Sequence, residues 1–107
     1  MGMTANELQQ WLQQRRSIEL LDLRRAAARA AEPRGIAGAR WLDPALWLDW
    51  KDNTAQDRPV VVYCAHGREI SQGLATALKV MGRDVHYLEG GLAAWQAAGL
   101  ATETLGA

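Results

Sequence analysis

The sequence predicts an α/β fold in which a central parallel sheet has helices on both faces. Segments with strand character alternate along the chain with segments of helical periodicity, an order typical of parallel strands joined by right-handed crossovers. The run Val60–Tyr63 is apolar throughout, as in strands that are buried on both faces. At 107 residues the chain can fill one core, so we expect a single domain over residues 1–107.

The first part of the chain predicts a helix, a strand and a second helix. Thr4 and Glu7 have the spacing of a capping box, which predicts a helix over residues 4–15. Residues 17–23 are mostly apolar and fit a strand covered on both faces. Residues 25–31 are rich in alanine and favour a short helix, which Pro33 ends.

The second part continues the alternation. Asp43 followed by Pro44 predicts the start of a helix that extends to residue 51. Ser71 is the predicted N-cap of a further helix, which Gly82 ends. The remaining predicted elements are a brief strand at 39–42, the central strand at 60–63, a strand at 85–88 and a closing helix at 92–98.

The composition argues against several classes of function. The formal charge is zero and the basic residues are scattered, so we expect no nucleic-acid partner and no binding to an anionic membrane surface. We find neither an apolar run of membrane-spanning length nor a signal peptide, and therefore expect a cytoplasmic protein. One cysteine and two distant histidines predict no metal site.

Cys64 is the candidate nucleophile. It stands at the carboxyl end of the central strand, where open α/β sheets bind their ligands. A polar stretch that leads into a helix follows it, and both backbone amides and a helix N-terminus favour a thiolate. The alternative at this point is an inert buried cysteine, since free cysteines often serve as small core residues.

Four segments in this order resemble the rhodanese family of sulfurtransferases. They are the Asp-x-Arg strand end within Leu20–Arg24, the turn Gly35–Ala39, the strand and loop Val61–Gly67, and the Gly-Gly-x-x-x-Trp-x-x-x-Gly signature within Leu88–Gly99. The resemblance covers nearly the whole chain and implies a rhodanese-like fold. The stretch from Cys64 to Gln72 also resembles rhodanese domains that are sometimes joined to chromate-resistance proteins.

The loop after the cysteine departs from the family pattern. The common pattern is Cys-x-x-Gly-x-Arg followed by serine or threonine, but here Glu69 takes the arginine position and Ser71 comes one residue late. We therefore infer a loop that is one residue longer than usual. Longer loops are associated with the phosphatase and arsenate-reductase branches, which read Cys-x5-Arg. Ile70 occupies that arginine's position, so the bidentate clamp for an oxyanion is missing.

The resemblance implies a sulfurtransferase that needs no cofactor. Sulfane sulfur would pass from thiosulfate or a persulfide donor to a thiol or cyanide, through a persulfide on Cys64. The substrate-binding residues would be Ala65, His66, Gly67, Arg68, Glu69 and Ile70, whose amides would surround the sulfur. Arg68 is the first candidate to attract the donor's sulfonate and His66 the second. Asp22 and Arg24 would support the loop through hydrogen bonds.

Two other functions stay open. One is a redox-sensing or sulfur-relay module that passes sulfur to a protein acceptor, and the other is an arsenate reductase or phosphatase-like enzyme. Trp41, Trp47 and Trp50 fit packing in the core or at its rim, but an exposed tryptophan surface would favour a protein partner. His86 lies within a predicted strand, and we interpret it as structural.

Overall fold

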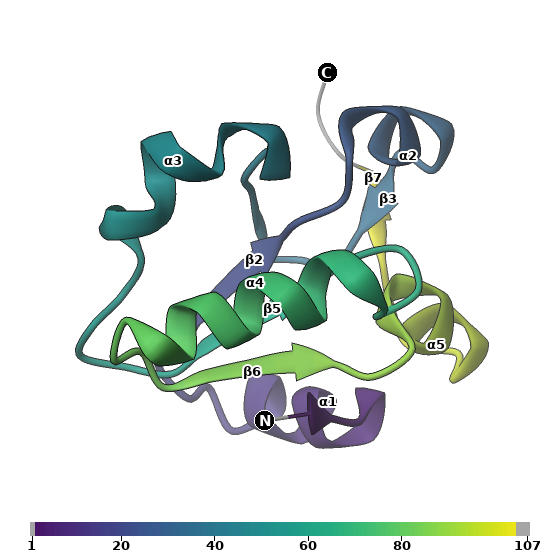
Figure 1. The fold of residues 1–107 in the computed structure, drawn as a ribbon. Helices are drawn as coiled ribbons and strands as arrows, with labels where there is room; N and C mark the ends of the chain where they lie inside the picture. The colour runs from purple at the N-terminus through teal and green to yellow at the C-terminus, as the bar shows by residue number, and fades with distance from the viewer. Residues whose placement is uncertain (1, 105–107) are drawn as a thin grey trace.

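The computed structural model describes residues 2–104 and contains a five-stranded sheet in which every neighbouring pair of strands is parallel (Figure 1). The strand order is β1-β6-β5-β2-β4. The strands are β1 (Gly2–Met3), β2 (Glu19–Asp22), β4 (Arg40–Trp41), β5 (Val60–Tyr63) and β6 (Val85–Leu88). This arrangement confirms the predicted parallel α/β fold.

The central strand β5 is buried along its whole length because helices cover both faces of the sheet. Val61 and Tyr63 pack with α1 (Ala5–Gln13) and α5 (Gly91–Ala97) on one face. Val60 and Val62 alternate to the other face and pack with residues of α3 (Trp47–Trp50) and α4 (Glu69–Val80). The uniformly apolar sequence of β5 follows from this burial on two sides.

The predicted capping box is present at the start of α1. The Glu7 amide donates to Thr4 Oγ1 at 3.1 Å, and the Thr4 amide donates to Glu7 Oε1 at 2.9 Å. The strand β1 just before this helix was not predicted. Its pairing with β6, which places Gly2 beside Tyr87, depends on a segment far along the chain.

A second, two-stranded sheet lies outside the parallel sheet. In it β3 (Arg34–Gly35) pairs antiparallel with β7 (Glu103–Thr104). The prediction had a turn at β3 and no element at β7, so it was wrong at both segments. The helix α2 (Ala26–Ala31), which precedes β3, confirms the predicted alanine-rich helix.

The single helix predicted after Asp43 is instead three short segments. They are η1 (Pro44–Leu46), α3 and η2 (Lys51–Asn53), of which η1 and η2 are 3₁₀ turns. Asp43 caps the first segment as predicted, and its backbone carbonyl accepts both the Leu46 amide at 2.9 Å and the Trp50 indole N–H at 2.8 Å. These local bonds to the Asp43 carbonyl, the first of them the i→i−3 bond of a 3₁₀ turn, take the place of a continuous α-helical ladder.

The helix that follows the cysteine also begins differently from the prediction. Ser71 is not its N-cap, because α4 starts at Glu69 and Ser71 lies in the first turn. The Ser71 side chain is fully buried and faces Cys64 instead of the helix end. The closing helix α5 starts at Gly91, one residue before the predicted start. Within residues 2–104, none of the helices combines the length and apolar character needed to cross a membrane.

Candidate active site

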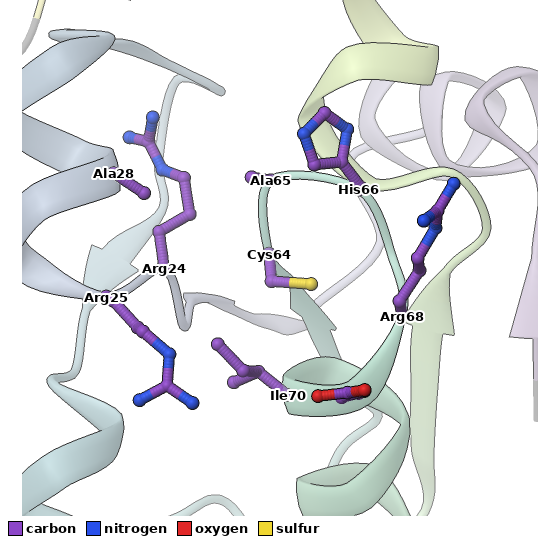
Figure 2. A pocket seen from close by; sticks show the side chains of 9 residues that line it. Arg24, Arg25, Ala28, Cys64, Ala65, His66, Arg68 and Ile70 are labelled. Atoms are coloured by element: carbon purple, nitrogen blue, oxygen red, sulfur yellow. The ribbon is translucent and has the colours of Figure 1, made fainter.

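Cys64 follows the last residue of β5 and forms part of a cavity of about 270 Å³ (Figure 2). The side chain is only 5% exposed. The cavity is lined by Arg24, Arg25, Ala28, Cys64, Ala65, His66, Arg68, Glu69 and Ile70. The structure therefore brings every predicted substrate-binding residue except Gly67 to one cavity, together with the predicted nucleophile and Arg24.

The surroundings of Cys64 stabilise its thiolate. Its Sγ lies 3.2 Å from the Ser71 Oγ, and the backbone amides of Ser71, Arg68 and His66 also hydrogen-bond to the sulfur. Burial by itself raises the pKa of the thiol, but these hydrogen bonds outweigh burial and lower the pKa below its usual 9.0. Sequence reasoning placed the amide cradle at residues 65–70 and missed Ser71, the residue that contributes most to the lowering.

The loop keeps its amides toward the sulfur because its carbonyls are bound elsewhere. The Cys64 carbonyl accepts the Leu92 amide at 2.9 Å, and the Ala65 carbonyl accepts the Ala93 amide at 3.0 Å. Both donors belong to the first turn of α5, whose amides have no partner within the helix. On the other side, Gln72 Nε2 donates to the Gly67 carbonyl at 2.7 Å. The closing segment of the chain thus positions the cysteine loop.

Two glycines permit this close approach. Gly67 has φ +67° and Gly91 has φ +60°, both in the left-handed region. A Cβ on Gly91 would lie 2.3 Å from the Cys64 carbonyl oxygen, and one on Gly67 would lie 2.6 Å from the Leu88 carbonyl oxygen. The glycine pair at 90–91, which belongs to the Gly-Gly-x-x-x-Trp signature, therefore also serves as the surface against which the loop packs.

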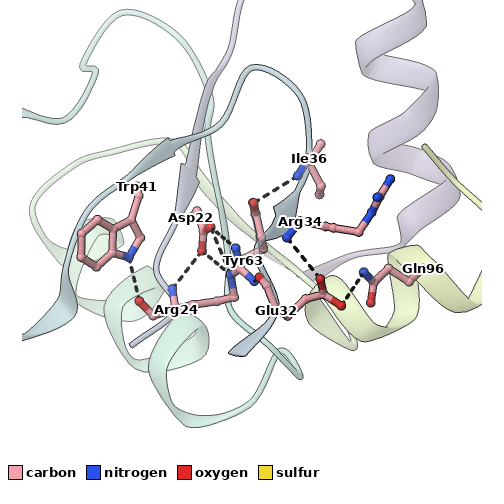
Figure 3. A network of polar contacts seen from close by, with 8 residues as sticks. All are labelled: Asp22, Arg24, Glu32, Arg34, Ile36, Trp41, Tyr63 and Gln96. Carbon is pink, nitrogen blue, oxygen red and sulfur yellow. Dashed lines mark hydrogen bonds and ion pairs between the residues drawn. The ribbon is translucent and has the colours of Figure 1, made fainter. Parts of the chain in front are cut away.

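Asp22 and Arg24 form a buried ion pair beside the site (Figure 3). Arg24 is 1% exposed, and its Nη2 lies 2.8 Å from Asp22 Oδ2, while its Nε contacts both carboxylate oxygens. Burial lowers the pKa of Arg24, but the hydrogen bonds and charge of Asp22 outweigh burial and raise it. The guanidinium is thus held as a cation that is already paired.

The hydrogen bonds of this pair run to neighbouring segments, not to the cysteine loop as expected. Arg24 Nη1 donates to the Glu32 carbonyl at 2.8 Å, and the Trp41 indole donates to the Arg24 carbonyl at 2.9 Å. Among the described residues, none of the pair's hydrogen bonds reaches residues 65–70. Nearby, the Tyr63 hydroxyl accepts the Ile36 amide at 3.3 Å (Figure 3). Asp22 and Arg24 therefore support the cavity wall through α2 and β4.

The basic groups around the cavity come from two segments, the connection between β2 and α2 and the loop between β5 and α4. Figure 2 shows Arg24 and Arg25 on one side of Cys64 and His66 and Arg68 on the other. Arg25, at the N-cap position of α2, was missed by sequence reasoning, because only the fold brings it to the cysteine. Its adjacency to the Asp-x-Arg strand end was the available signal.

The remaining aromatic and histidine side chains have structural contacts. Trp50 is buried and packs edge-on against Trp47 with ring centroids 4.9 Å apart. Trp41 is half-buried and bound to Arg24. His86 Nε2 lies 3.2 Å from Asp84 Oδ1, and its ring packs edge-on against Trp11. These contacts agree with the interpretation of the tryptophans as packing and of His86 as structural.

The fold and this site define a parallel α/β protein that presents a stabilised cysteine thiolate from an amide-lined loop. Residues 4–98 match the rhodanese-like domain, so the chain belongs to the rhodanese-like family. The thiosulfate sulfurtransferase GlpE of Coxiella burnetii (strain RSA 331 / Henzerling II) is 33% identical to it over 94 residues, which cover 86% of this chain and 85% of that protein.

Solved structures share the fold. A rhodanese-related protein from Thermoplasma volcanium has 20% identity and a TM-score of 0.83, over 96% of this chain and 97% of that one. A thiosulfate sulfurtransferase from Pseudomonas aeruginosa has 28% identity and a TM-score of 0.77, over 97% of this chain but only 19% of that one. A protein of unknown function from Rhodopseudomonas palustris CGA009, described as a possible tyrosine phosphatase, has 24% identity and a TM-score of 0.83, over 95% of this chain and 83% of that one.

Proposed function

We propose that this protein is a sulfurtransferase that carries sulfane sulfur as a persulfide on Cys64. The observation that carries the proposal is the polar surroundings of the Cys64 sulfur, which are the Ser71 Oγ at 3.2 Å and the backbone amides of Ser71, Arg68 and His66. Such a set favours an attacking thiolate and equally a persulfide anion in the same place. The similarity to a GlpE thiosulfate sulfurtransferase supports the same function.

In the first step the Cys64 thiolate attacks the outer sulfur of thiosulfate. The sulfur–sulfur bond of the donor breaks, sulfite leaves with the bonding electron pair, and a persulfide remains on the cysteine. Arg68 lines the cavity beside Cys64 and is exposed at its rim, where its cation would attract the donor's sulfonate. Arg24 is less suited to this task because Asp22 already neutralises it.

In the second step a thiol or cyanide attacks the terminal sulfur of the persulfide. The persulfide bond breaks, and the Cys64 thiolate returns to its hydrogen bonds. A thiol acceptor leaves as a persulfide, and cyanide leaves as thiocyanate. A relay to a protein thiol follows the same chemistry, and a protein acceptor and a cytoplasmic location stay predictions.

An arsenate-reductase or phosphatase-like function has less support from the site. Ile70 lines the cavity at the position where a Cys-x5-Arg loop would place its arginine. An apolar side chain there offers no bidentate hydrogen bonds to a phosphate or arsenate group. A phosphatase assay with a phosphate ester therefore serves as the contrasting measurement, and we expect no activity above that of Cys64→Ser.

The direct test is persulfide formation. The protein is incubated with thiosulfate and its intact mass is measured, with a gain of one sulfur atom expected for the wild type and no gain for Cys64→Ser. Cyanide should then remove the added sulfur and release thiocyanate. Wild-type turnover by Cys64→Ser would refute the nucleophile assignment.

The role of Arg68 has a separate test. We expect Arg68→Ala to raise the KM for thiosulfate about fivefold, because an exposed ion pair contributes at most about 1 kcal/mol. Arg15→Ala, which removes an exposed arginine at the far end of α1, is the control and should leave the KM unchanged. Equal KM values for Arg68→Ala and the wild type would show that this side chain does not contact the donor.

A further inference from the structure

We propose that the sulfur acceptor is a small zwitterionic thiol of amino-acid size, whose carboxylate binds Arg25 and whose ammonium group binds Glu69. The inference rests on the proposed persulfide function and names its acceptor class. It starts from two opposite charges that line the cavity of Cys64.

Arg25 and Glu69 are available to a ligand. Arg25 stands at the N-cap position of α2, and Glu69 is the first residue of α4. Both side chains are exposed, and within residues 2–104 neither forms an ion pair or a side-chain hydrogen bond. Arg24, by contrast, is buried and bound to Asp22.

The two charges lie where two cavities meet. A second cavity of about 260 Å³ shares Arg25, Glu69 and Ile70 with the cysteine cavity and extends past Pro44 to Leu74. Arg68 lines the first cavity but not the second, so the second cavity borders Arg25 and Glu69 and not the proposed donor contact. A ligand whose polar end sits at this junction can direct its thiol toward Cys64.

The size and lining of the site favour a compact acceptor. The cysteine cavity, about 270 Å³, lies below the range of about 300–1,000 Å³ typical of pockets for drug-sized ligands. Ile70 lies in both cavities and offers an apolar contact to the short carbon chain between the charged groups and the thiol. Glu69 repels a dianionic donor but attracts an ammonium group, so its charge suits the acceptor step and not the donor step.

The transfer balances without any further reactant. The acceptor thiolate forms a bond to the terminal sulfur of the Cys64 persulfide, and the persulfide bond breaks. Its electron pair returns to Cys64 as a thiolate, and the acceptor leaves as a persulfide. The proton of the acceptor thiol passes to water when the thiolate forms.

The test measures single-turnover transfer from the thiosulfate-loaded protein to four thiols. Cysteine carries both charges, cysteamine only the ammonium group, 3-mercaptopropionate only the carboxylate, and 2-mercaptoethanol neither. Because these thiols differ in intrinsic reactivity, each variant is compared with the wild type for one thiol at a time. Loss of the added sulfur mass gives the rate constant.

Each substitution should slow transfer only to the thiols that carry the partner of the lost charge. We expect Glu69→Gln to slow transfer to cysteine and cysteamine about fivefold, the upper range for an exposed ion pair, and not to slow transfer to the other two. Arg25→Gln should slow cysteine and 3-mercaptopropionate by a similar factor. Glu69→Asp should restore most of the loss, and Glu103→Gln, an exposed carboxylate on β7, is the control with no effect.

The result that would overturn the inference is an equal change for all four thiols in Glu69→Gln and in Arg25→Gln. In that case a protein that still gains and releases sulfur keeps its proposed function and loses only this acceptor assignment. A wild type that never gains sulfur from thiosulfate would refute the proposed function itself. Far-UV circular dichroism of each variant distinguishes a lost charge from a lost fold.

Discussion

Removal of the Ser71 hydroxyl should destabilise the thiolate of Cys64 relative to the neutral thiol. Ser71 is fully buried and its Oγ lies 3.2 Å from the sulfur, so water cannot replace the lost hydrogen bond without opening the site. The neutral thiol can donate to this hydroxyl, whereas the thiolate accepts from it, and the second arrangement is the stronger because it is charge-assisted. Ser71→Ala should therefore raise the pKa of Cys64.

The size of the effect follows from the hydrogen bond. A hydrogen bond to a charged group contributes about 1.5–3 kcal/mol. At a pH well below the pKa of Cys64, loss of this bond lowers the population of the thiolate by the corresponding factor. A more basic thiolate is also a better nucleophile, and this offsets about half of the loss on a logarithmic scale. We therefore expect persulfide formation from thiosulfate to slow about 4- to 13-fold at low pH.

The assay is the pH dependence of Cys64 alkylation by iodoacetamide, together with the rate of sulfur loading from thiosulfate. The Ser71→Ala profile should move to higher pH, and the difference from the wild type should vanish or reverse once both thiols are ionised. Thr76→Ala is the matched control, because the Thr76 hydroxyl lies on the same helix but bonds to the Gln72 carbonyl. Identical profiles for Ser71→Ala and the wild type would refute the role of this hydroxyl.

Three further predictions concern stability. In urea unfolding, Gly91→Ala should lower the free energy of unfolding by about 2–5 kcal/mol, and Gly99→Ala should lower it by only about 1–2 kcal/mol. Both glycines have positive φ, but only a Cβ on Gly91 would meet the Cys64 carbonyl, so equal losses would contradict the packing argument. Asp22→Ala should cost about 3–5 kcal/mol because it leaves the Arg24 cation buried and unpaired, and a cost below about 1 kcal/mol would show that the pair is not needed. The pKa of Cys64 is lowered in the fold, so the folded protein binds fewer protons, and the unfolding free energy of the wild type relative to Cys64→Ala should rise with pH up to about 9.0. A difference that falls over this range would have the wrong sign.

Local sequence signals were sufficient to predict the helices and strands that carry a hydrophobic pattern or a capping motif. The capping box at Thr4 predicted α1, and the four apolar residues of β5 predicted a strand buried on both faces. Cys64 was identified as the candidate nucleophile from its place after that strand. These features depend on neighbouring residues, so the sequence contains them directly.

Other parts of the fold and site depend on segments that are distant in the sequence. The strands β1, β3 and β7 were missed because each forms only where a partner strand from a distant part of the chain lies beside it. The N-terminus of α4 was misplaced for a related reason, because Ser71 resembles an N-cap until the fold turns its hydroxyl toward Cys64.

The sequence by itself determined the fold class and the family, and it indicated Cys64 as the candidate nucleophile. Only the tertiary structure decided what surrounds that residue. In the folded chain, Arg25 at the start of α2 lines the cavity and Arg24 pairs with Asp22. Gly91 allows the start of α5 to pack against the cysteine loop. The physical reason is that a nucleophile follows from residue type and local pattern, whereas its pKa and its charged neighbours depend on contacts between distant segments.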